Sequence, residues 1–113
     1  MRIYHNPACG TSRTVLGMIK DAGIEPAVVE YLKTPPDRAQ LTDLLSLLGL
    51  SPRQILRTKG TTLETLGLDE AKMTDQQILD TILEHPILME RPIVVKGTKA
   101  AVCRPAEKVE PFL

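Results

Sequence analysis

The chain has 113 residues, with 14 basic and 14 acidic side chains, so its formal net charge is zero. This length supports a single domain, and the balanced charge excludes a protein drawn to nucleic acid or to an anionic membrane by a global field. With no Trp, one Phe, two Cys and no apolar run near the roughly 18 residues of a membrane span, we expect a cytoplasmic protein that binds neither nucleic acid nor membrane.

The first third of the chain predicts a strand, a helix and a second strand. Arg2–His5 is typical of a short strand, and it leaves no room for a signal peptide. Thr11–Ala22 has apolar residues at helical spacing, and Gly23 supplies its C-terminal stop. Ala27–Tyr31 is a β-branched run that predicts a buried strand.

Helices are predicted for the middle of the chain. Leucines recur at i, i+3, i+4 and i+7 in the first of them, and a capping box, Thr74 to Gln77, opens the last. The predicted helices are Arg38–Leu48, a short helix from Pro52 to about Arg57, Thr61–Leu66, and one from Thr74 to about Glu84.

The last part of the chain predicts a hairpin and a final helix. Pro92–Lys96 and Lys99–Cys103 are strands joined by a turn at Gly97 and Thr98, and the helix runs from Pro105 through Val109. The first two strands can be parallel through the first helix, whereas the hairpin strands are antiparallel. This mixed α/β sheet resembles the thioredoxin-like arrangement.

Cys9 lies where the first strand gives way to the first helix. Unpaired N–H groups and the positive dipole end at a helix start stabilise a thiolate and attract oxyanions. Gly10, Thr11 and Ser12 are small or polar, so a ligand can approach the backbone there. We therefore interpret Cys9 as a nucleophile beside an anion site, rather than as a buried hydrophobic residue, and expect its pKa to lie below the free-thiol value of about 8.5.

The spacing around Cys9 excludes several kinds of site. Ser12 stands where a C-x-x-C pair would have its second thiol, and a C-x5-R phosphatase loop would place its arginine at Val15. Two Cys and two His without C-x2-C or H-x3-H spacing also argue against a metal site.

Five further residues have open interpretations. His5 is either a protonated neighbour that lowers the thiol pKa or a strand-end histidine paired with backbone. Ser12 either helps the thiolate with its hydroxyl or simply caps the helix. Arg91 precedes the third predicted strand, and Arg104 follows the fourth. These two arginines either meet at one edge of the sheet to bind a tetrahedral oxyanion or are ordinary solvated arginines. Cys103 lies in an apolar strand, which favours a core residue over a resolving thiol.

Six segments of the chain carry a resemblance to a known family. They are Ile3–Arg13, Tyr31–Pro36, Ile55–Arg57, Glu64–Leu68, His85–Val95 and Cys103–Pro105. Together they closely resemble the glutaredoxin-coupled arsenate reductase family over nearly the whole chain, and the first and fifth segments are highly specific in combination.

The resemblance assigns roles to five residues. It implies that Cys9 is the catalytic cysteine, that His5 tunes it, and that Arg57, Arg91 and Arg104 bind the oxyanion. It also implies a single thioredoxin-like domain over residues 1–113, with a helical insertion at about residues 36–90 between strands two and three.

The resemblance further implies a cis proline and a reaction. Pro92 matches the cis-proline of thioredoxin folds, which would let backbone face the thiol. Arsenate would bind among the arginines and the amides at the first helix, and the Cys9 thiolate would form a thiol–arsenate adduct. Glutathione, as co-substrate, and glutaredoxin would then release arsenite, with no bound cofactor. This fits the missing C-x-x-C, because the second thiol must come from outside.

Two other functions agree with the same residues. One is a thiol oxidoreductase acting on glutathione mixed disulfides. The other is a non-enzymatic regulator that binds RNA polymerase, a group found in the same superfamily. Many of those regulators use a C-x-x-C redox switch, and this chain has Ser12 at the position of its second thiol.

Overall fold

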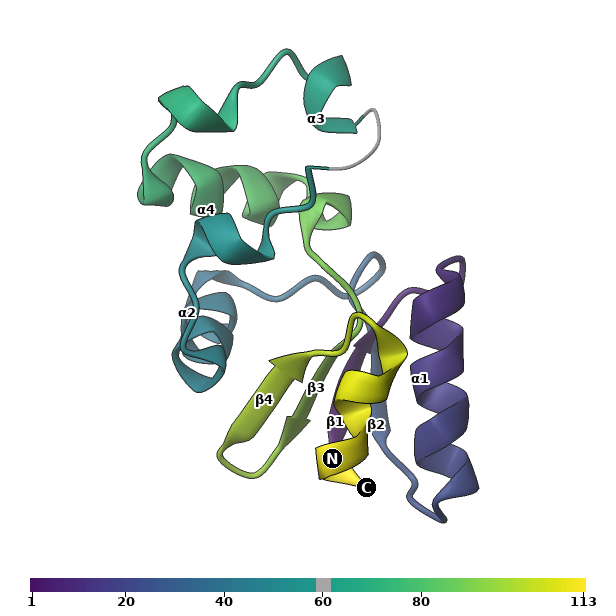
Figure 1. Ribbon diagram of the computed structural model, residues 1–113. Coiled ribbons are helices and arrows are strands. Elements are labelled where there is room, and N and C mark those ends of the chain that lie inside the picture. The colour runs from purple at the N-terminus through teal and green to yellow at the C-terminus, as the bar shows by residue number, and fades with distance from the viewer. Residues whose placement is uncertain (59–61) are drawn as a thin grey trace. The chain divides into compact units, whose positions relative to one another are not determined.

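The computed structural model describes residues 1–58 and 62–113, and the chain divides into two compact units. One unit combines Met1–Pro35 with Arg91–Leu113, and the other is Pro36–Glu90. Figure 1 shows the course of the chain through both units. Cys9 and both hairpin strands therefore belong to the unit that is built from the two ends of the chain.

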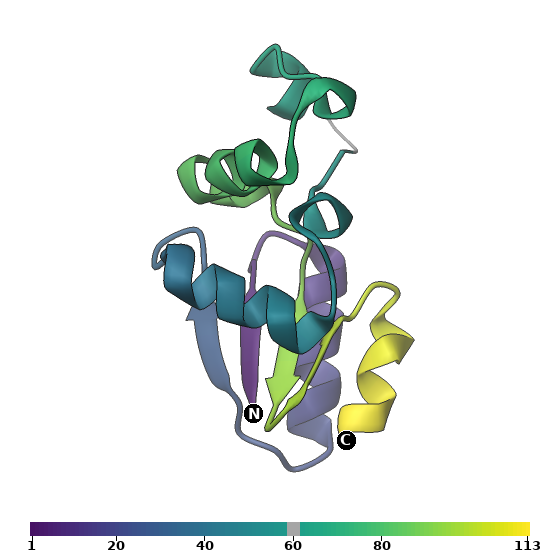
Figure 2. The same cartoon turned by 90° about the vertical axis from the view of Figure 1, so that its left-hand side faces the viewer.

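A mixed four-stranded sheet forms the centre of the first unit. Its strands are β1 (Arg2–His5), β2 (Ala27–Glu30), β3 (Ile93–Lys96) and β4 (Lys99–Val102), in the order β2-β1-β3-β4 (Figure 2). As predicted, β1 is parallel to β2, and β3 is antiparallel to β4. Strand β1 also pairs with β3 in antiparallel orientation, so β1 has a neighbouring strand on each side.

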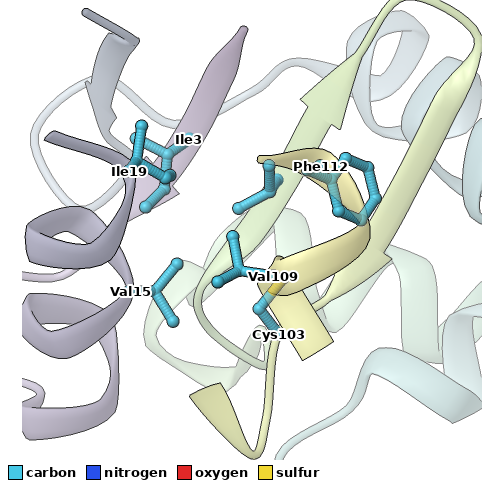
Figure 3. Packing of buried hydrophobic residues seen from close by; sticks show 7 residues of the cluster. Ile3, Val15, Ile19, Cys103, Val109 and Phe112 are labelled. Carbon is cyan, nitrogen blue, oxygen red and sulfur yellow. The ribbon is translucent and has the colours of Figure 1, made fainter. Parts of the chain in front are cut away.

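The core of this unit lies between the sheet and two helical segments. Helix α1 (Gly10–Asp21) and the 3-10 segment η4 (Ala106–Phe112) lie side by side in Figure 1, and both contribute to one apolar cluster. Burial of such side chains is the main favourable term in folding. The cluster, shown in Figure 3, consists of Ile3, Val15, Ile19, Val94, Cys103, Val109 and Phe112.

The prediction that the second strand is buried is wrong. Strand β2 lies at one edge of the sheet, and Val28 keeps 43% of its surface exposed. Within the predicted run Ala27–Tyr31, only Tyr31 is completely buried, and it follows the strand rather than belonging to it. A β-branched run indicates strand propensity, but the position of a strand within the sheet depends on distant segments.

The second unit is made of helices and short helical turns. Helix α2 (Arg38–Leu48) has the predicted bounds and ends at Gly49, whose positive φ of 67° suits a glycine. Helix α4 (Asp75–Glu84) begins at the predicted capping box, in which Thr74 accepts from the backbone N–H of Gln77. The shorter elements are η1 (Pro52–Ile55), α3 (Thr62–Thr65), η2 (Glu70–Lys72) and η3 (Pro86–Leu88); the predicted start of α3 at Thr61 lies outside the described residues.

Candidate active site

The loop between β1 and α1 holds Cys9 at the start of the helix. The backbone N–H of Cys9 donates to the Asn6 carbonyl at 3.0 Å, and the N–H of Ala8 donates to the Asn6 side-chain oxygen at 2.9 Å. Arg13 reaches back along the helix and donates to the Pro7 carbonyl at 2.9 Å. Cys9 thereby takes the N-cap position of α1, next to the unpaired N–H groups of the first turn.

The surroundings of Cys9 favour the thiolate. Burial alone raises the thiol pKa, but a hydrogen bond from the backbone N–H of Ser12 and the guanidinium groups of Arg91 and Arg104 lower it further than burial raises it. The Nη1 atom of Arg104 lies 3.9 Å from the Cys9 Sγ atom. The net pKa therefore lies below the ordinary value of 9.0, in the direction that the sequence predicts.

Sheet pairing explains why two distant arginines meet at the thiol. Ile93 pairs with Tyr4 on one side and with Val102 on the other, so the start of β3 lies beside the ends of β1 and β4. Arg91 lies just before β3 and Arg104 just after β4. Both arginines are therefore at the end of the sheet where β1 leads into the Cys9 loop. The structure thus brings these two residues together with the thiol, as one of the two sequence interpretations expects.

Two peptide bonds near the site are cis. The bond before Pro92 is cis, as the resemblance implies, and the bond between Arg104 and Pro105 is also cis. The backbone N–H of Cys103 donates to the Pro92 carbonyl at 2.9 Å.

The Cys103 side chain does not take part in this site. It is completely buried in the apolar cluster, and burial raises its pKa to about 11. Cys103 is therefore a core residue and a poor nucleophile.

His5 interacts with Ser12 rather than with the thiol or the backbone. Its Nδ1 atom lies 2.6 Å from the Ser12 Oγ atom, which also accepts from the backbone N–H of Asn6 at 3.1 Å. Burial, the largest influence, lowers the His5 pKa below 6.5, so the imidazole is mainly neutral at pH 7. A neutral ring and a hydroxyl can share this hydrogen bond in either direction, depending on which ring nitrogen carries the proton. This partner differs from both sequence interpretations of His5, and Cys9 rather than Ser12 is the N-cap residue.

Gly10 and Thr11 form the first turn of α1 and leave its backbone accessible. A Cβ atom added at Gly10 would meet, outside its own helix backbone and chain neighbours, only the Arg13 guanidinium at 3.8 Å. That is an ordinary van der Waals distance. There is therefore open space beside the Cα atom of Gly10.

Arg57 lies in the other unit. Its backbone N–H donates to the Leu88 carbonyl at 2.6 Å, and its Nη1 atom lies 3.6 Å from the Glu90 Oε2 atom. A bridge between Leu56 and Met89 sets these two side chains next to each other. Within its own unit, therefore, the guanidinium of Arg57 is neutralised by a half-buried carboxylate.

Asn6 and Tyr31 belong to the site but were not among the predicted site residues. Asn6 organises the Cys9 loop, and the Tyr31 hydroxyl lies within electrostatic reach of Arg91 and Cys9. Both residues directly follow strands that are parallel to each other. In open α/β sheets, ligands bind beyond the carboxyl ends of such strands, and this signal would have identified both positions.

Residues 1–58 and 62–113 contain neither a metal-binding cluster nor a helix that could span a membrane. No group of three or more His, Cys, Asp or Glu side chains lies together in a way that could hold a metal ion. In the same ranges, no helix has the length and apolar character that crossing a membrane requires.

This chain is similar to a known family and to proteins named arsenate reductase. The ArsC family model matches residues 4–112. A protein of Rhizobium meliloti named arsenate reductase is 55% identical over 107 residues, which cover 95% of this chain and 76% of that protein. A protein of Neisseria meningitidis with the same name is 44% identical, and the match covers 100% of this chain and 97% of that protein.

A solved structure extends the comparison to the fold. The arsenate reductase from Vibrio cholerae is 39% identical and superimposes with a TM-score of 0.91, covering 99% of this chain and 96% of that chain. The predicted fold class, a thioredoxin-like mixed sheet with helices, is thus confirmed.

Proposed function

This chain belongs to the ArsC family, and we propose that it is an arsenate reductase that converts arsenate to arsenite. The observation that carries the proposal is the position of Cys9 at the start of α1, with Arg91 and Arg104 acting on its thiol. A thiolate next to two cations is a nucleophile beside a site for an anion. Arsenate is a tetrahedral oxyanion with an electrophilic centre, which suits that combination.

The substrate is held by arginines and by backbone amides. Arg91 and Arg104 donate to arsenate oxygens, and the first-turn N–H groups of Gly10 and Thr11 complete the oxyanion site. The N–H of Ser12, which donates to the Cys9 sulfur in the free protein, becomes available to the oxyanion once that sulfur bonds to arsenic. Arg57 is the third oxyanion-binding arginine on the strength of the family resemblance.

The first chemical step forms a bond between sulfur and arsenic. The Cys9 thiolate attacks arsenic, and one arsenate oxygen leaves as water after it has been protonated. Arsenic keeps its oxidation state in this step, and the product is a thiol–arsenate adduct on Cys9. The lowered pKa of the thiol increases the fraction of nucleophile at neutral pH.

The second step needs a thiol from outside the chain. Ser12 replaces the second cysteine of a C-x-x-C pair, and Cys103 is buried in the core. Glutathione therefore attacks Cys9 Sγ, and the electron pair of the sulfur–arsenic bond passes to arsenic, which is reduced by two electrons and leaves as arsenite. Glutaredoxin then removes glutathione from Cys9 by disulfide exchange.

His5 acts on the thiol indirectly in this proposal. Its ring is hydrogen-bonded to the Ser12 hydroxyl, whose oxygen in turn accepts from the Asn6 N–H. These bonds hold the backbone on either side of Cys9. The dependence on glutathione also favours work in the cytoplasm, where thiols are kept reduced.

The test is arsenite release from arsenate with glutathione and glutaredoxin. Wild-type protein is compared with Cys9→Ser and Arg91→Ala, and Cys103→Ala serves as the matched cysteine control. We expect no turnover from Cys9→Ser, a large loss from Arg91→Ala, and wild-type turnover from any folded Cys103→Ala protein. Turnover that survives Cys9→Ser would overturn the assignment of the nucleophile.

A folded wild-type protein that releases no arsenite would reject arsenate as substrate. A glutathionylated peptide would then replace arsenate in the same comparison. Loss of glutathione from that peptide with wild type, but not with Cys9→Ser, would assign the chain to glutathione mixed disulfides instead.

A further inference from the structure

Tyr31 lies beside the Cys9 loop because of the pairing between β1 and β2. His5 is opposite Glu30 in this parallel pair, so the next residues along the two strands, Asn6 and Tyr31, are neighbours at the carboxyl end of the sheet. Val28, earlier in the same strand, is largely exposed, whereas the Tyr31 side chain is completely buried. An edge strand thus delivers one buried aromatic ring to the site.

The hydroxyl of this ring is buried without a hydrogen-bond partner among the described residues. Leaving a buried hydroxyl unpaired is unfavourable, and the large majority of buried polar side-chain atoms in proteins are hydrogen-bonded. Such an atom at a site that faces Cys9 and Arg91 suggests a partner that is not part of the chain. Burial raises the Tyr31 pKa above 10, with Arg91 and Asn6 opposing the shift and Cys9 adding to it, so the phenol stays protonated and able to donate.

The neighbours of the hydroxyl leave its hydrogen without an acceptor. Arg91 carries only donors, so towards it the Tyr31 oxygen can only accept. The side-chain oxygen of Asn6 accepts from the N–H of Ala8 at 2.9 Å and makes no hydrogen bond with the Tyr31 hydroxyl. A negatively charged oxygen bound between Cys9 and Arg91 would supply the missing acceptor.

We propose that Tyr31 is a further substrate-binding residue, whose hydroxyl donates to an oxygen of the oxyanion held at Cys9 and Arg91. This inference rests on the proposed function of the Cys9 site and adds a neutral donor to its cations. A hydrogen bond between a neutral donor and a charged acceptor is stronger than one between two neutral groups. Tyr31 therefore strengthens arsenate binding without adding charge to the site.

The test measures binding through protection of the thiol, without glutathione and hence without turnover. Increasing arsenate protects Cys9 from alkylation by iodoacetamide, and Cys103 does not interfere because it is buried. We expect Tyr31→Phe to need at least about tenfold more arsenate for half protection. Tyr4→Phe is the matched control, since the chain has two tyrosines and Tyr4 lies within β1.

A second measurement covers the case in which Tyr31→Phe does not fold. The chain has no Trp, so in Tyr4→Phe protein the tyrosine emission comes from Tyr31 alone. We expect arsenate, but not sodium chloride at equal ionic strength, to change that emission with the same midpoint as thiol protection. Emission that stays constant while arsenate protects the thiol would overturn the proposal.

The outcomes separate this inference from the proposed function. If arsenate protects folded Tyr31→Phe at wild-type concentrations, Tyr31 is not a substrate-binding residue, although the oxyanion site at Cys9 stands. If arsenate fails to protect wild-type Cys9 at any concentration, the oxyanion site itself is refuted, and the role of Tyr31 with it.

Discussion

The Nη1 atom of Arg104 lies 3.9 Å from the Sγ atom of Cys9, although 95 positions separate the two residues in the sequence. The strand order β2-β1-β3-β4 produces this contact, because the ends of β1 and β4 flank the start of β3. A guanidinium at this distance stabilises the thiolate electrostatically. The contact therefore links the topology of the sheet directly to the reactivity of the thiol.

Replacing Arg104 by methionine removes the cation and keeps most of the stem of the side chain. We expect the Cys9 pKa to rise towards its ordinary value of 9.0, because one of the influences that lower it is lost. Alkylation of Cys9 at neutral pH should slow by roughly threefold or more, since the thiolate is the reacting species. Thiolate absorbance measured against pH follows the titration directly.

The control for this variant is Arg2→Met. Arg2 opens β1 and lies over the Tyr4 ring, at the other end of the strand from the Cys9 loop. Its loss should leave the thiol titration unchanged. Equal titrations for wild type and Arg104→Met would show that Arg104 does not stabilise the thiolate.

The buried position of Cys103 predicts that native protein has one reactive thiol. A thiol-specific chromogenic disulfide should react with one cysteine in the native state and with two after denaturation, because Cys103 is shielded by the cluster and has its pKa raised to about 11. Cys103→Ala should lower the free energy of unfolding by about 1–2 kcal/mol through the cavity it leaves. Two fast-reacting thiols in the native state would contradict this assignment.

Local signals in the sequence predicted most elements of the fold. The capping box at Thr74 and the leucine spacing of Arg38–Leu48 are encoded within a few residues, so α4 and α2 begin and end close to where they were expected. The prediction that the strand at Ala27–Tyr31 is buried was wrong, because strand order is decided by pairing between distant segments. The final helix was expected to start at Pro105, and it is a 3-10 segment that continues to Phe112.

The site was predictable where it depends on strand ends and helix starts. Cys9, Arg91 and Arg104 carry such signals, and the structure brings them together. The partner of His5 was not predictable, because the contact between its ring and Ser12 spans the turn from strand to helix. Tyr31 was missed because it was predicted to lie within a buried strand, whereas it directly follows the carboxyl end of β2.

The capping box of α4 gives a prediction on stability alone. Thr74→Ala removes the hydroxyl that accepts from Gln77 at 3.2 Å, so the free energy of unfolding should fall by about 1 kcal/mol in urea titrations. Thr42→Ala, at an exposed position inside α2, is the matched control and should cost nothing comparable. Alkylation of Cys9, which lies in the other unit, should proceed at the wild-type rate in both variants.

The buried neutral His5 predicts a loss of stability in mild acid. Its pKa is lowered in the folded state, mainly by burial, so the unfolded chain takes up the proton first as the pH falls below the ordinary value of 6.5. The free energy of unfolding should therefore be fully retained above pH 6.5 and decline from there down to the folded-state pKa. Urea titrations on both sides of pH 6.5 measure this decline.

His5→Gln should reduce the decline, because glutamine can still hydrogen-bond to Ser12 but does not titrate. The matched control is His85→Gln, since the chain has two histidines and His85 lies partly exposed at the end of α4. Its unfolding free energy should keep the wild-type dependence on pH. If His5→Gln and His85→Gln lose stability equally as the pH falls, protonation of His5 is not the cause, and the assignment of a buried neutral imidazole beside Ser12 is wrong.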